Sequence, residues 1–150
     1  MNVSHTVPEE LGRRPGVYVV WVEARRPLRI AVGALGVVRF AAGHYLYVGS
    51  ARGGLGARVS RYLRRRQRLF WHVDYLCARA RVRGVWLRQG EKLGECQLAQ
   101  VLLERLSVQQ GPRGFGSSDC RCPTHLLFSR GSPARAFRAS GLFHALVTPR

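Results

Sequence analysis

The sequence predicts an α+β domain with a small, mainly antiparallel sheet flanked by helices. Three observations lead to this fold class. Apolar, β-branched runs fill much of the first fifty residues, amphipathic helical patterns dominate after residue 54, and one further strand-like run interrupts them. Strands that come first, followed by helices around one more strand, are typical of α+β domains.

The first expected strand is the run GVYVVWV at residues 16–22, which is apolar throughout and does not alternate with polar residues. This continuous pattern indicates a strand that is covered on both faces. Residues 29–40 contain two short strand-like pieces with a turn near residues 33–36, which predicts an extra hairpin. The next strand is expected at residues 44–50.

Helices are expected at about residues 55–66, 70–80 and 94–106, and a further strand at 81–88. The first helix has one apolar stripe at i, i+4, i+7 and i+8, formed by Leu55, Val59, Tyr62 and Leu63. The apolar pattern does not indicate whether the C-terminal residues form helix or strand. We therefore expect a single domain over residues 1–150, with a core at about 15–128 and a C-terminal extension at 129–150.

The charge balance indicates a polyanionic partner. The chain has 25 basic and eight acidic residues, a net charge of +17, and every basic residue except Lys92 is arginine. A GC-rich genome would explain arginine in place of lysine, but it would not explain the excess of base over acid. We therefore expect nucleic acid as the partner, and no small-molecule cofactor.

Hydropathy predicts a cytoplasmic protein without a membrane partner. No apolar run approaches the roughly 20 residues that span a bilayer, and the N-terminal residues lack the apolar region of a secretory signal. In that compartment the four cysteines are expected to be thiols rather than disulfides.

The stretch GSARGGLG at residues 49–56 follows a predicted strand and precedes a predicted helix. It matches neither the Walker A pattern nor the dinucleotide-binding pattern, which argues against a phosphate cradle. A tight strand-to-helix turn at Gly53 and Gly54 is the better interpretation.

Two charged side chains lie at apolar helix stripes, Arg58 at the border of one and Glu95 within another, and each has two interpretations. Arg58 either covers apolar surface with its stem or stabilises charge on a phosphate. Glu95 falls on one stripe with Ala99, Leu102 and Leu106. It is either a first-turn acid favoured by the helix dipole or an inward ligand for a metal that keeps mostly water and phosphate ligands. Tyrosines 18, 45 and 47 in strands either pack or act on a phosphate or a water.

Four features in a fixed order resemble the GIY-YIG endonuclease superfamily. They are GVY at 16–18, YVG at 47–49, Arg58 on the next helix and Glu95 on a later one. The stand-alone Uri-type branch is the most similar, on the stretches YVGSARGGLGARVSRY, WHVDYL, ECQLA and GFGSSDCRC. The chain departs from the family in a long insert between the tyrosine motifs, and in Tyr62 where many relatives carry histidine.

The resemblance implies a divalent-metal-dependent endonuclease that hydrolyses phosphodiester bonds in DNA, in repair or processing. Tyr18 would act as general base or orient the water, Tyr47 would place the phosphate or the water, and Arg58 would stabilise the pentavalent phosphate. Glu95 would bind Mg²⁺ or Mn²⁺, and His72 is a second candidate for the base. A non-catalytic nucleic-acid-binding module on the same scaffold is the alternative.

Further arginines on and around the arginine-bearing helix are expected to contact DNA: Arg52, Arg61, Arg65 and Arg68. In the stretch WHVDYL, His72 and Asp74 either pair near the active site, or His72 contacts DNA.

The stretch DCRCPTH at residues 119–125 contains zinc-capable ligands: the thiols of Cys120 and Cys122, the imidazole of His125 and the carboxylate of Asp119. Cys77 or Cys96 would supply a further thiol. One residue between two cysteines is tighter than the usual zinc spacing of two to four. The spacing therefore favours buried thiols and a hydrogen-bonded histidine over Zn²⁺.

Overall fold

The computed structural model describes residues 1–64, 68–90, 92–117 and 120–150. The strands are β1 (Asn2–Ser4), β2 (Gly16–Ala24), β3 (Leu28–Ala31), β4 (Val37–Phe40), β5 (Gly43–Ala51), β6 (Arg81–Gln89), β7 (Gln109–Gln110), β8 (Leu126–Ser129) and β9 (Ala145–Val147). The helices are α1 (Glu9–Gly12), α2 (Leu55–Leu63), α3 (His72–Cys77), α4 (Glu95–Arg105) and α5 (Ala134–Ser140), with a 3₁₀ turn at Gly33–Leu35.

The main sheet has the strand order β1-β9-β6-β2-β5-β8-β7. Among the described strands, β1 and β9 at one edge form the only parallel pair, and the other pairs are antiparallel. Strands β3 and β4 form a separate antiparallel hairpin between β2 and β5. The predicted fold class, including the extra hairpin, is confirmed.

Strand β2 lies at the centre of the sheet, and its residues alternate between two buried clusters. Tyr18, Val20 and Val22 belong to one cluster, whereas Val17, Val19 and Trp21 belong to the other. Both faces of the strand are therefore covered, which explains its continuous apolar sequence.

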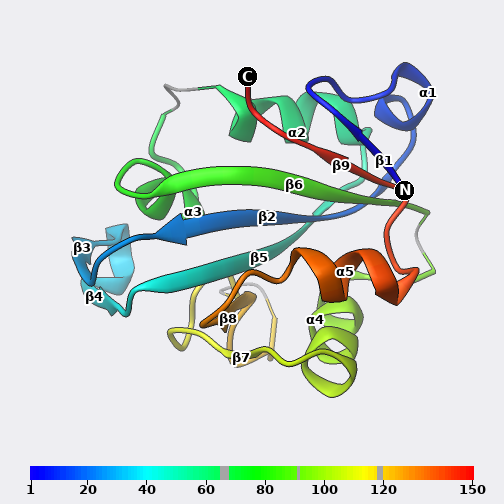
Figure 1. Ribbon diagram of the computed structural model, residues 1–150. Helices are drawn as coiled ribbons and strands as arrows, with labels where there is room; N and C mark the ends of the chain where they lie inside the picture. The colour runs from blue at the N-terminus through cyan, green and yellow to red at the C-terminus, as the bar shows by residue number, and fades with distance from the viewer. Residues whose placement is uncertain (65–67, 91, 118–119) are drawn as a thin grey trace.

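Helices cover the two faces of the sheet separately (Figure 1). Apolar residues of α2 and α3 pack with the β3–β4 hairpin on one face. Residues of α4 and α5 pack on the other face. The cleft described below lies where β5 ends, between α2 and the start of α4.

The C-terminal stretch, whose form the sequence left open, contributes a helix and a strand. Strand β9 lies between β6 and the N-terminal β1, with Ala145 opposite Leu87 and Leu146 opposite Trp86. Figure 1 shows the two terminal strands, β1 and β9, side by side at this edge. Over the ranges that the structure describes, there is no helix of the length and apolarity needed to cross a membrane.

Candidate active-site cleft

A cleft of about 600 Å³ collects the side chains that the sequence singled out. Its lining comes from β2, β5, α2, the start of α3, the start of α4 and the loop before β8. The side chains and backbone that form it are Tyr18, Tyr47, Gly49, Ser50, Arg52, Gly53, Arg58, Phe70, Trp71, His72, Glu95 and Gly116.

The two tyrosine motifs meet across adjacent strands. The β2–β5 register places Tyr18 opposite Gly49 and Val20 opposite Tyr47. A Cβ atom on Gly49 would lie 2.5 Å from the Tyr18 ring carbon Cζ, so only glycine leaves room for that ring. The hydroxyl of Tyr18 lies 3.3 Å from that of Tyr62 on α2.

Burial keeps the cleft phenols protonated. It raises the pKa of Tyr18, against the smaller lowering effects of the Tyr62 hydrogen bond and the Arg58 charge. Burial also raises the pKa of Tyr47, and the neighbouring Tyr18 and Glu95 raise it further. Both tyrosines therefore carry a hydroxyl proton that can be donated in a hydrogen bond.

Arg58 reaches the cleft from α2. The helix starts after Gly54, whose φ of 115° confirms the predicted glycine turn. The guanidinium carbon of Arg58 lies 4.5 Å from the ring centroid of Trp71, which holds the side chain by a cation–π contact. Within the described ranges Arg58 has no ion pair with an acid.

Arg61, one turn later, has a different environment. Its guanidinium stacks 4.6 Å from the same Trp71 ring, but it is ion-paired with the fully buried Asp74. It also donates to the carbonyl of Arg68 at 2.8 Å. Arg61 is thus occupied by contacts within the protein, whereas the other predicted DNA contacts Arg52 and Arg68 are exposed. Arg65 lies outside the described residues.

His72 and Asp74 do not pair with each other in the structure. Asp74 accepts bonds from the backbone N–H groups of Phe70 and Trp71, both at 2.8 Å, as well as from Arg61. The Nδ1 of His72 accepts from the backbone N–H of Gly116 at 2.8 Å. Because burial lowers the pKa of His72, its ring is neutral with the proton on Nε2. In this state His72 presents a donor to the cleft.

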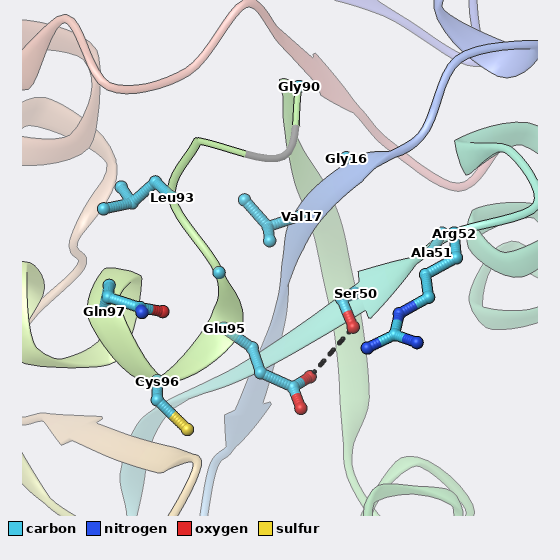
Figure 2. A pocket seen from close by; sticks show the side chains of 11 residues that line it. Gly16, Val17, Ser50, Ala51, Arg52, Gly90, Leu93, Glu95, Cys96 and Gln97 are labelled. Carbon is cyan, nitrogen blue, oxygen red and sulfur yellow. Dashed lines mark hydrogen bonds between the residues drawn. The ribbon is translucent and has the colours of Figure 1, made fainter.

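Glu95 is the first residue of α4, and its Oε2 accepts a hydrogen bond from the Ser50 hydroxyl at 3.2 Å. Figure 2 shows this bond in a neighbouring pocket, which Ser50, Arg52 and Glu95 line as well. A single accessible carboxylate fits Mg²⁺ or Mn²⁺, which would take its other ligands from water and phosphate.

The Cys–His cluster forms beside the cleft. The ligand atoms of Cys96, Cys120, Cys122 and His125 all lie within 4.8 Å of one another. Cys96, which follows Glu95 directly, is therefore the fourth member, and Cys77 packs with the other face of the sheet. Asp119 lies outside the described residues.

Three lining residues were missed by the sequence reasoning. Ser50 is the hydrogen-bond partner of Glu95, Trp71 supports the Arg58 guanidinium, and Phe70 has 75% of its surface exposed at the cleft. The sequence signal that could have identified Trp71 and Phe70 was the apolar run LFW at residues 69–71, which follows an arginine-rich stretch. An exposed aromatic side chain among arginines can stack on a nucleic-acid base.

A model of the family described as "Domain of unknown function DUF123" matches residues 17–146, and the match includes every predicted catalytic and metal-binding residue. No curated protein and no solved structure matches the chain.

Proposed function

The chain belongs to the DUF123 family, and we propose that it is a divalent-metal-dependent endonuclease of the GIY-YIG type, similar to the Uri branch, that cleaves DNA. The observation that supports this proposal is the convergence of Tyr18, Tyr47, Arg58, His72 and Glu95 on one cleft. These residues span 77 positions of the sequence, and nothing in their local patterns requires them to meet.

The cleft combines positive charge and hydrogen-bond donors with one carboxylate. Arg58, the two phenols and the Nε2–H of His72 suit the oxygens of a phosphodiester and the charge that builds up on them during attack. Glu95 lines the same cleft and accepts a hydrogen bond from Ser50. This polarity fits a bound phosphate better than a neutral substrate.

Glu95 would hold the metal ion, with Ser50 fixing the orientation of its carboxylate. When bound, such an ion activates water or neutralises the leaving oxygen. The raised pKa of Tyr18 favours its water-orienting role over that of a general base, and the donor state of His72 favours a contact with phosphate. Arg58 supplies fixed positive charge next to the phosphate.

DNA would extend past the cleft along exposed basic and aromatic residues. Arg52 and Phe70 line the cleft and Arg68 lies near it in sequence, all three exposed. Arg61 is better assigned to holding Asp74 and Trp71 in place. A base stacked on Phe70 would add contact without sequence specificity, so we expect recognition of nucleic-acid structure rather than of a long sequence.

The decisive experiment is cleavage of labelled single-stranded, duplex, flap and branched DNA with Mg²⁺, Mn²⁺ or EDTA. Wild type is compared with Glu95→Gln, which keeps the shape of the side chain and removes its charge. Cleavage that needs metal and disappears in Glu95→Gln supports the proposal. Tight binding without cleavage in either protein would instead identify a non-catalytic binding module.

Binding itself is tested by its salt dependence. If about six to ten phosphates are engaged, affinity should fall by about 10³–10⁵ between roughly 50 and 200 mM salt. A nearly flat dependence, measured by fluorescence anisotropy, would contradict a polyanionic ligand.

A further inference from the structure

We propose that Cys96, Cys120, Cys122 and His125 bind one structural Zn²⁺ ion. The site is separate from the carboxylate of Glu95 and does not depend on the proposed nuclease activity. Its residues come from two segments that are more than twenty positions apart, the first turn of α4 and the loop before β8.

The distances within the cluster match a tetrahedral site. The Nε2 of His125 lies 3.4 Å from the Sγ of Cys96 and 3.4 Å from the Sγ of Cys120. Zinc–sulfur bonds of about 2.3 Å and zinc–nitrogen bonds of about 2.0 Å give tetrahedral sulfur–nitrogen edges of about 3.5 Å. One nitrogen and three sulfurs around one point is also the ligand set that favours zinc over Mg²⁺ or Mn²⁺.

The burial of His125 is poorly explained without a metal. The residue is 1% exposed, and its Nδ1 has no hydrogen-bond partner within the described ranges. Among the described residues, the hydrogen-bond partners of its Nε2 are the sulfurs of Cys96 and Cys120, which are weak hydrogen-bonding groups. Burying an imidazole with such partners costs free energy. A metal ion would replace these weak contacts at Nε2 with a coordinate bond, and the ring proton would then lie on Nδ1.

The tight Cys-x-Cys spacing, which argued against zinc in the sequence, is offset by the fold. The loop before β8 is held against its surroundings by backbone bonds from His125 to Phe115 at 2.9 Å and from Val48 to His125 at 2.9 Å. It presents Cys120, Cys122 and His125 toward α4, where Cys96 completes the set. A local pair of cysteines thus becomes part of a four-ligand site.

The position of the site gives the ion a structural task. Figure 2 shows the Glu95 carboxylate and the Cys96 sulfur leaving the start of α4 in different directions. The loop that carries the other ligands also contains Gly116, which lines the cleft and bonds to His72. Zinc would therefore connect two walls of the cleft.

The test begins with metal analysis of the full chain, expressed with added zinc and purified under reducing conditions without a metal-affinity column. We expect one zinc per chain by mass spectrometry, and thiolate charge-transfer and tetrahedral absorption bands after replacement with Co²⁺. Removal of zinc by a chelator should lower the Tm by on the order of 10 °C, and zinc should restore it.

Two cysteine variants show whether zinc binding depends on this site or only on the number of cysteines in the chain. Cys122→Ser should bind zinc at least ~100-fold more weakly, whereas Cys77→Ser, on the other face of the sheet, should keep one zinc per chain. If Cys122→Ser does not fold, His125→Cys serves instead and should retain zinc with four sulfur ligands. Wild type without zinc after reconstitution, or equal zinc in wild type and Cys122→Ser, would overturn the proposal. These readouts need no nucleic acid, so they stand apart from the cleavage test.

Discussion

Two regions of this protein use the same four residue types in opposite ways. Each has a glutamate, an arginine stacked on a tryptophan, and a histidine whose Nδ1 accepts an N–H bond. The first region contains Glu23, Arg83, Trp21 and His44, and the second contains Glu95, Arg58, Trp71 and His72.

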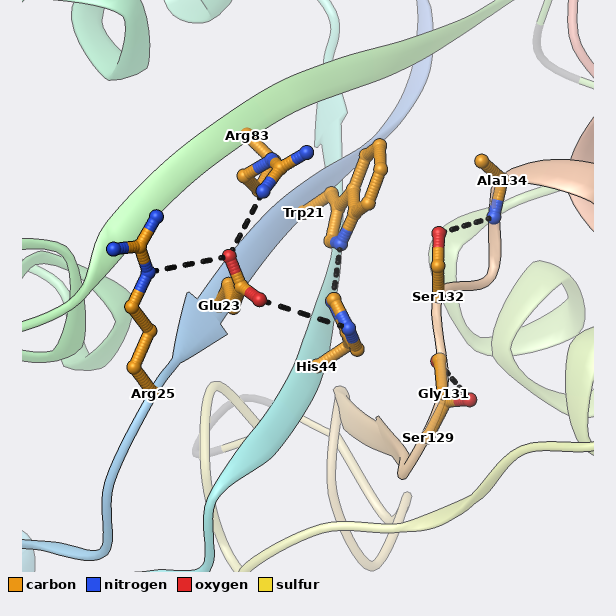
Figure 3. Close-up of polar contacts among 9 residues, drawn as sticks. All are labelled: Trp21, Glu23, Arg25, His44, Arg83, Ser129, Gly131, Ser132 and Ala134. Carbon is orange, nitrogen blue, oxygen red and sulfur yellow. Dashed lines mark hydrogen bonds and ion pairs between the residues drawn. The ribbon is translucent and has the colours of Figure 1, made fainter.

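The Glu23 region is internally satisfied (Figure 3). Glu23 accepts a bond from Arg83 at 2.9 Å, and Arg25 and His44 each lie 4.0 Å from its carboxylate. Trp21 donates to the Nδ1 of His44 at 2.9 Å. The only carboxylate of this network is thus paired with arginine inside the network itself.

The cleft keeps its charges apart. Glu95 bonds to an uncharged hydroxyl, and Arg58 lies on Trp71 without an acidic partner in the ranges described. Composition alone therefore does not separate a structural polar cluster from a binding site. The two regions differ in whether the glutamate and the tryptophan-stacked arginine form an ion pair with each other.

The largest expected effect is on catalysis. Arg58→Ala should lower kcat for metal-dependent cleavage by on the order of 10²–10³-fold, because it removes fixed positive charge at the phosphate. Arg83→Ala also removes a tryptophan-stacked arginine, and it should cleave like wild type. The measurement is single-turnover cleavage at saturating protein. Equal losses in both variants would contradict the contrast between the regions.

The next effect concerns stability and the two arginines of α2. Arg61→Ala should lower the free energy of unfolding by about 3 kcal/mol, because it leaves Asp74 buried without its charged partner. Arg58→Ala should change it by less than about 1 kcal/mol. Urea unfolding of both variants checks this. A more stable Arg61→Ala protein would show that the ion pair does not stabilise the fold.

A smaller effect is expected at the two glutamates. Glu23→Gln should lower stability by about 1 kcal/mol, because the Arg83 pair is partly exposed and screened. That corresponds to a fall in Tm of about 2–4 °C. Glu95→Gln should leave the Tm unchanged in the absence of Mg²⁺ or Mn²⁺, since Ser50 can still donate to the amide oxygen. Calorimetry without added Mg²⁺ or Mn²⁺, at equal zinc content, compares the two, and a larger loss in Glu95→Gln would assign that residue a structural role.

The smallest effect is the pH dependence of stability. Burial lowers the pKa of both His44 and His72 below the ordinary value of 6.5. The folded protein then binds fewer protons than the unfolded chain, so this stability is complete above about pH 6.5 and is lost as the pH falls through the folded pKa values. The Tm should decrease between about pH 7 and pH 5.

The histidine variants show which region carries that dependence. His44→Gln and His72→Gln should each reduce the slope of Tm against pH in this range. A slope that neither variant changes would place the titrating groups elsewhere.

Much of the fold could be predicted because its signals are local. The periodicity of α2 and the continuous apolar run of β2 determine which residues are buried, and the chain alone specifies both. Strand β9 was not predicted, since three apolar residues carry too weak a local signal. It forms because the backbone of β6 has an edge free of β2, and β9 pairs with that edge in antiparallel register.

For the candidate site, the sequence by itself determined which side chains are available and on which face of each element they lie. Arg58 and Glu95 were found in this way, because a position beside an apolar stripe must be half-buried. Only the tertiary structure decided the partners: Asp74 for Arg61 instead of His72, Gly116 for His72, and Cys96 for the Cys–His cluster. These contacts join segments far apart in the chain, and whether two charges or ligands come within bonding distance depends on how whole elements pack.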